Sequence, residues 1–240
     1  QFLPETIKGD IPPEFTNSFI SILDDTYFVN DAYMTLYLEG FSIRIGKQQI
    51  PWGTGYTWNP TDNFHNKNQL DPTYEKEGVN AMTLDIPWGP DGSLTAVAAT
   101  RAETEDPSFA IKLKKNILGF DVSGSWQYIS EMNLDPEKLT TAERQRNVIG
   151  FDFTGEIFGL GFWGEGTYNI PSENSFLKDN YTESLLGIDY TFQNELYFMF
   201  EYLHRTQGEG TKDQYSFFDF LKTYYGETTN IGTDYLVCGL

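Results

Sequence analysis

The chain has 240 residues and a formal net charge of −19, with 16 Lys and Arg against 35 Asp and Glu. This charge argues against nucleic-acid binding, because Lys and Arg are needed to neutralise phosphates. A single cysteine cannot form an internal disulfide, and one cysteine with two histidines leaves few ligands for zinc. We therefore expect no metal centre and no cofactor. Neither His65 nor His204 lies in a catalytic motif, and we expect no enzyme.

No stretch approaches the ~20 apolar residues that a membrane-spanning helix requires, and the mean hydropathy is −0.43. Strands can still cross a membrane, because a barrel strand hides its apolar half by alternation. The N-terminal stretch "QFLPETIKGD" lacks the basic start and apolar core of a signal peptide. We expect residues 1–30 to form a partly irregular N-terminal segment, followed by a single, incomplete β domain over residues 31–240.

Period-two alternation predicts eleven strands and almost no helix. The predicted strands are 32–38, 41–50, 78–86, 93–101, 107–115, 119–129, 147–157, 160–169, 182–192, 196–205 and 232–240. Residues 136–145 and 214–225 are compatible with short helices inside loops. The second of these segments, which contains "YSFFDFLKTYY", is equally compatible with a further strand or with a segment at the membrane interface.

Short and long connections alternate strictly along the chain. The short ones are 39–40, 87–92, 116–119, 158–161 and 193–195, and the long ones are 51–77, 102–106, 130–146, 170–181 and 206–231. In an up-and-down meander, successive connections lie at opposite ends, so all the tight turns share one end. This asymmetry is typical of bacterial outer-membrane barrels, whereas a soluble sandwich usually has long connections at both ends. The predicted fold is therefore all-β: an antiparallel up-and-down transmembrane β-barrel.

Each strand has an apolar face, predicted to contact lipid, and a polar face, predicted to line a lumen. Alternation of apolar and polar side chains with period two does not by itself distinguish a barrel from a soluble sandwich. The Gly, Ser and Thr residues and the charges of both signs on the polar face favour a hydrated lumen. The residues expected to line the pore and set its selectivity are Arg44, Gln48, Asp85, Arg101, Lys112, Lys114, Asp121, Asp152, Glu165, Asp189 and Glu201. The aromatic residues expected at the membrane interface are Trp52, Trp88, Tyr128, Tyr168 and Tyr202.

Several interpretations of these polar residues stay open. Arg44 is expected to pair with inward carboxylates, either as an ion-pair ladder that stiffens the wall or as part of a constriction that orients solutes. Glu165 and Glu201 are the pair that a glycosidase would need, although no glycosidase motif surrounds them. Loop 51–77 is rich in Asn and Asp, which suits either a self-packed polar loop or a Ca²⁺ site.

The stretch "RIGKQQIPWG" at residues 44–53, followed by "NPTDNF" at 59–64, resembles a family of porin-like Gram-negative outer-membrane proteins. The family pattern is roughly Arg-x-Gly-Arg/Lys-Gln-x-Ile-x-Trp-Gly, then Asn-Pro-x-Asp. The matching residues are Arg44, Gly46, Lys47, Gln48, Ile50, Trp52, Gly53, Asn59, Pro60 and Asp62. The resemblance covers the chain from about Asp31 onward. It implies a single-chain outer-membrane barrel with a polar interior, and it does not imply an enzyme.

Barrels of this kind have an even strand number and end on an aromatic residue, whereas this chain ends at Leu240. We therefore expect a fragment of a larger barrel. The leading functional prediction is a channel for passive diffusion of small polar or charged solutes. The alternatives are a barrel that serves as scaffold or sheath for a partner protein, and a soluble β-rich carbohydrate-binding or hydrolytic domain.

The expected location is the bacterial outer membrane, in contact with its lipid. Acidic long loops such as 102–106 suit divalent cations beside lipopolysaccharide. The expected partners are thus lipid, lipopolysaccharide and small polar solutes, with either self-association or a partner protein in addition and no nucleic acid.

Overall fold

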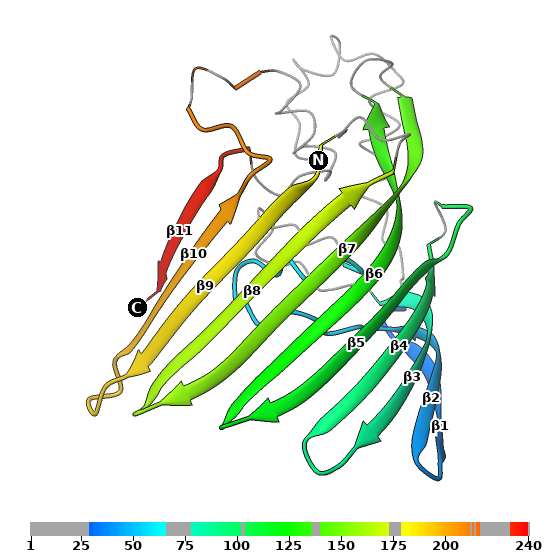
Figure 1. The fold of residues 1–240 in the computed structure, drawn as a ribbon, viewed down its shortest axis with the longest axis horizontal. Helices are drawn as coiled ribbons and strands as arrows, with labels where there is room; N and C mark the ends of the chain where they lie inside the picture. The colour runs from blue at the N-terminus through cyan, green and yellow to red at the C-terminus, as the bar shows by residue number, and fades with distance from the viewer. Residues whose placement is uncertain are drawn as a thin grey trace, which may run out of the picture.

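The computed structural model describes residues 29–65, 78–101, 104–135, 140–172, 179–211, 213, 215–216 and 231–239. These residues form a single antiparallel sheet in which each strand pairs with the next one along the chain (Figure 1). The strands are β1 (Ala32–Leu38), β2 (Phe41–Gln48), β3 (Val79–Trp88), β4 (Gly92–Thr100), β5 (Ser108–Ile117), β6 (Phe120–Asp135), β7 (Thr140–Ile157), β8 (Leu160–Pro171), β9 (Tyr181–Thr191), β10 (Tyr197–Arg205) and β11 (Asp234–Gly239).

All eleven predicted strands are confirmed, and so is the all-β, up-and-down order. A short helix over 136–145, which the sequence allowed, is not formed by the described residues 140–145. Residues from Thr140 onward belong to β7, and Gln145 pairs with Ser130 of β6. Pairing with a long neighbouring strand outweighs weak local helix propensity here. Residues 136–139, most of the 214–225 segment and residues 1–28 lie outside the described part of the chain.

The short connections lie together at one end of the sheet, as predicted (Figure 1). Two of them have positive φ at both central residues: 55° and 88° at Leu118 and Gly119, and 54° and 79° at Phe158 and Gly159. That pattern is the type I′ turn, whose twist matches the right-handed twist of the flanking strands. The tight turns therefore set the register of neighbouring strands.

The sheet is strongly curved (Figure 1), and its two faces differ in the side chains that they carry. The convex face exposes large apolar side chains, with Met34, Ile149 and Leu186 respectively 58%, 53% and 59% exposed. They continue across strands through pairs such as Leu36↔Ile43 and Ile111↔Trp126. The concave face instead buries polar side chains, among them Gln127, Asp152, Glu165 and Glu201. The sheet therefore has an apolar convex face and a concave face that carries polar side chains.

The buried apolar residues form two small clusters on the concave side. In one, Trp52 and Phe64 lie with Val97 and Ile129 of the sheet. In the other, Trp58 lies with Trp163, Leu185 and Leu203. Each cluster combines residues of the β2–β3 connection with residues of the sheet, so the core lies between this connection and the sheet. Over the described ranges, no helix has the length and apolar character needed to cross a membrane.

Candidate functional site

The described part of the β2–β3 connection, residues 49–65, folds back over the concave face instead of extending away from the sheet (Figure 1). We call it the inner loop. Gly53 has a φ of +90°, and a Cβ there would lie 2.7 Å from Cβ of Asn59, so this close approach requires glycine. Residues 59–62 form a turn closed by the Asp62 N–H and the Asn59 carbonyl at 3.0 Å. Pro60 takes the second position of that turn, where proline is favoured.

The carboxylate of Glu165 on β8 anchors both arms of the inner loop. Its Oε1 accepts hydrogen bonds from the backbone N–H groups of Thr54 and Gly55, the latter at 2.8 Å. Its Oε2 accepts from the backbone N–H of Thr61 at 2.9 Å and from the Thr61 hydroxyl at 2.8 Å. Buried N–H groups need such partners, and a carboxylate makes strong ones. Glu165 therefore fixes the shape of the loop.

Glu201 on β10 performs the same task for the tip of the loop. Its oxygens accept from the backbone N–H groups of Tyr56 at 2.6 Å and Thr57 at 2.8 Å, and from Nε1–H of Trp163 at 2.7 Å. All four oxygens of the two buried glutamates thus accept hydrogen bonds from the loop or from Trp163. This arrangement suits structural anchoring of the loop.

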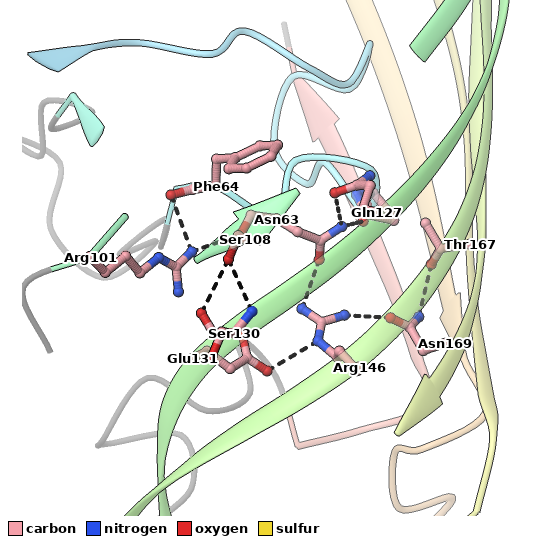
Figure 2. A network of polar contacts seen from close by, with 11 residues as sticks. Asn63, Phe64, Arg101, Ser108, Gln127, Ser130, Glu131, Arg146, Thr167 and Asn169 are labelled. Atoms are coloured by element: carbon pink, nitrogen blue, oxygen red, sulfur yellow. Dashed lines mark hydrogen bonds and ion pairs between the residues drawn. The ribbon is translucent and has the colours of Figure 1, made fainter. Parts of the chain in front are cut away.

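The far arm of the inner loop is held by β6 and β7 (Figure 2). Oδ1 of Asn63 accepts from Arg146 at 2.8 Å, and Nδ2 of Asn63 donates to Gln127 at 3.2 Å. Gln127 in turn donates to the Thr61 carbonyl at 2.9 Å. Arg101 donates to the Asn63 and Phe64 carbonyls at 2.8 and 3.3 Å. The loop is therefore fixed along its length by side chains of the sheet.

His65 closes the inner loop at its base. Its Nε2 accepts from the backbone N–H of Ile50 at 3.4 Å, and its Nδ1 lies 2.9 Å from Oδ1 of Asp62. Both ring nitrogens therefore take part in loop contacts. His204, the other histidine, lies 2.9 Å from Asp234 at the end of the sheet. Within the described ranges, no group of three or more His, Cys, Asp or Glu is arranged to hold a metal ion.

Beside the inner loop, the concave face lines an open cavity of about 410 Å³. Its walls are the inward residues of β2 to β7 and residues 49–54 of the loop. Two ion pairs cross its floor: Lys112 with Asp152 at 2.8 Å, and Lys114 with Asp121 at 2.6 Å. The rest of the lining combines Ser and Thr hydroxyls with apolar groups such as Ile50 and Trp52, so the cavity carries charges of both signs on a partly apolar wall.

All eleven residues predicted to line a lumen point to the concave side, but they do not form one group. Arg44, Gln48, Asp85, Lys112, Lys114, Asp121 and Asp152 line the cavity. Arg101, Glu165 and Glu201 bind the inner loop, and Asp189 accepts from the Tyr197 hydroxyl at 3.0 Å.

Gln48 has a structural role in addition to lining the cavity. It is only 1% exposed, because it donates to the Ala81 carbonyl at 2.9 Å and accepts from Thr83 at 3.1 Å, so it joins β2 to β3. One expectation about these residues needs correction. Arg44 was expected to pair with an inward carboxylate. It instead donates to Oγ1 of Thr35 at 3.3 Å and lies over the Tyr33 ring, and the lysines of β5 take the carboxylates.

The prediction that Trp52 lies at a membrane interface is also wrong. Trp52 is 6% exposed, contacts Phe64 edge-on with ring centroids 5.5 Å apart, and lies beneath Lys112 on the concave side. The reason is that the chain turns inward after β2 and does not continue along the strand direction. Trp88, Tyr128, Tyr168 and Tyr202 alternate with the concave residues of their strands and therefore face the convex side.

Sequence reasoning identified Arg101, Glu165 and Glu201 as inward residues but did not connect them to the inner loop. The loop meets the two glutamates through five backbone N–H groups, and a backbone donor has no side-chain signature. Gln127 and Arg146 were recognisable only as further inward positions on strands. The one usable signal was the Gly53 and Asn59–Pro60 pair of the predicted motif, which marks where the loop turns back.

No protein-family model matches the chain, and no curated protein and no solved structure matches it either. The resemblance to porin-like outer-membrane proteins therefore stays a prediction. The function is argued below from the geometry of the sheet, the inner loop and the cavity.

Proposed function

We propose that this sheet is part of the wall of a bacterial outer-membrane β-barrel and that the protein is a porin-like channel for small polar or charged solutes. The observation that carries the proposal is the opposite chemistry of the two faces of one curved sheet. Exposed apolar side chains extend over the convex face from Met34 on β1 to Leu236 on β11. Soluble monomers rarely expose an apolar patch larger than a few hundred Å², so this face suits lipid.

The backbone also fits this environment. Inside lipid every N–H and C=O must be paired internally, and the continuous ladders from β1 to β11 satisfy this within the sheet. Among the described residues, β1 and β11 do not pair with each other. An open edge in lipid costs several kcal/mol for each unpaired group. We therefore propose that both edges are paired in the membrane and that the wall is closed.

The proposed mechanism is diffusion along the hydrated concave face. The inner loop occupies part of that side and narrows the path, while the 410 Å³ cavity keeps a space with charged walls open beside it. Charges of both signs line this space, so selectivity is set by width and by the placement of these charges. Passage of this kind needs no chemical step.

Planar-bilayer recording tests the proposal. The chain, folded in detergent and added to a lipid bilayer, is expected to give stepwise conductance. Heat-modifiable migration on denaturing gels reports separately whether a closed barrel has formed. A closed barrel without conductance would contradict the channel, and a folded chain that stays soluble without detergent would contradict the membrane assignment as well.

One observation favours a second candidate, a barrel that serves as scaffold for a partner protein. Two buried carboxylates fix the inner loop across the concave side, which suits a filled interior as well as a narrowed one. Purification from native membranes separates the two functions. A scaffold is expected to retain a stoichiometric partner and a channel is not.

A further inference from the structure

Some of the charged side chains around the cavity form ion pairs and others do not. Lys112 and Lys114 are neutralised by ion pairs with carboxylates of β6 and β7. Arg44 and Asp85 also line the cavity, and neither forms an ion pair with a residue in the described part of the chain. The cavity therefore presents one unmatched cation and one unmatched anion.

Arg44 and Asp85 are held in place by neutral partners. Arg44 donates from Nε to Oγ1 of Thr35 and lies 4.6 Å from the centre of the Tyr33 ring, which supports the cation from one side. Asp85 accepts from Oγ1 of Thr95 at 2.6 Å, through one oxygen. These contacts orient both groups without cancelling their charges.

The register places the two charges close to each other. Arg44 pairs across the β2–β3 ladder with Thr83, and Asp85 lies two residues further along β3. Such diagonal neighbours are about 7–8 Å apart at their Cα atoms. This spacing leaves room for a small molecule to contact both groups within one cavity.

A third group in the cavity is also unmatched. Ser123 is only 3% exposed, and its hydroxyl has no hydrogen-bond partner among the described residues although it lines the same space. Buried hydroxyls are normally paired, so this one is a further polar contact for a bound molecule.

We propose that this cavity is a binding site for zwitterionic solutes of the size of an amino acid or dipeptide. The solute carboxylate lies on the Arg44 guanidinium, which suits bidentate recognition, and the ammonium lies on Asp85. An anion alone would leave Asp85 unmatched, and a cation alone would leave Arg44 unmatched. The volume of about 410 Å³ is in the usual range for small-molecule sites. The inference rests on the proposed channel only for the route by which solutes reach the cavity.

Calorimetric titration of the folded full chain in detergent micelles tests this inference with four probes of similar size. They are glycylglycine (both charges), N-acetylglycine (negative only), glycylglycinamide (positive only) and N-acetylglycinamide (neutral). Glycylglycine is expected to bind roughly tenfold or more tightly than each of the others, because charge-assisted hydrogen bonds form at both ends. The comparison needs no substitution, so it decides the question even where a variant fails to fold.

Variants then locate the site. Arg44→Gln and Asp85→Asn are each expected to weaken glycylglycine binding roughly tenfold or more. Lys115→Gln and Glu156→Gln remove charges of the same signs that do not line the cavity, and they are expected to leave binding unchanged.

Equal binding of N-acetylglycine and glycylglycine, insensitive to Asp85→Asn, would establish a simple anion site and overturn the inference. Absence of binding of all four probes to a folded chain would also overturn it. Bilayer conductance is read separately. Conductance without binding rejects the zwitterion site and keeps the channel, whereas binding without conductance supports the site and rejects the channel.

Discussion

One oxygen of the Glu165 carboxylate accepts hydrogen bonds from both the backbone N–H and the hydroxyl of Thr61, at 2.9 and 2.8 Å. The two residues lie 104 positions apart in the chain. This contact joins the inner loop to the opposite part of the sheet, and the first prediction follows from it.

Replacement Glu165→Gln is expected to loosen the inner loop. An amide nitrogen replaces one accepting oxygen and faces N–H donors, so the stability falls by about 2 kcal/mol. Urea unfolding in detergent measures the loss, and limited proteolysis reports release of the loop. Glu156→Gln, on the same concave side but exposed, is the matched control. Equal cleavage of the two variants would show that Glu165 does not hold the loop.

Loosening the same loop is expected to alter the channel. If residues 49–65 narrow the path, Glu165→Gln raises single-channel conductance or its noise relative to Glu156→Gln. Recordings at one salt concentration make the comparison direct. An unchanged conductance, together with loop release in the proteolysis assay, would mean that the loop does not limit the passage of ions.

Two tryptophans on opposite faces offer a test of the lipid-facing surface. Trp126 is exposed on the convex face, and Trp52 is buried on the concave side. In vesicles with brominated acyl chains, Trp126→Phe is expected to reduce the fraction of emission that is quenched, because the proposed orientation places this ring in contact with lipid. Trp52→Phe is expected not to reduce it. The reverse order would contradict the proposed orientation of the sheet.

A charge on the convex face is expected to oppose insertion. Lysine at a lipid-facing barrel position costs about 2–4 kcal/mol near the bilayer centre. Ile149→Lys is therefore expected to lower the fraction of chain that inserts into vesicles. Glu156→Lys, on the other face of the same strand, is the control. Similar insertion of both variants would count against lipid contact at Ile149.

The turn at Leu118 and Gly119 allows a local test of strand pairing. Leucine at a φ of 55° is strained, and Leu118→Asn is expected to stabilise the fold by about 0.5–1 kcal/mol, since Asn-Gly suits a type I′ turn. Gly119→Ala is expected to destabilise it by about 1 kcal/mol through backbone strain alone, because a Cβ there meets no atom within 4 Å. Urea unfolding in detergent measures whether each variant raises or lowers the free energy of unfolding. A Leu118→Asn variant that is less stable than the parent protein would contradict the turn assignment.

The sequence by itself determined the strands, their order and the chemistry of the two faces. These properties depend on local signals: alternation with period two, and Gly-containing tight turns that leave antiparallel neighbours little choice of partner. That is why eleven predicted strands agree with the structure, and why residues such as Lys112 and Glu165 were placed on the correct face.

Only the tertiary structure decided the course of the inner loop and the pairing of charges on the concave face. The sequence predicts Trp52 at a membrane interface and Arg44 in an ion pair, whereas in the structure Trp52 is buried and the lysines of β5 pair with the carboxylates. Both predictions fail because these contacts join segments far apart in the chain. Backbone donors such as the N–H of Gly55 have no sequence signature, and the course of a loop depends on the acceptors that bind its N–H groups. In this chain those acceptors are Glu165 and Glu201, about 100 or more positions beyond the loop in the sequence. Patterns read over short windows do not detect contacts at such a separation.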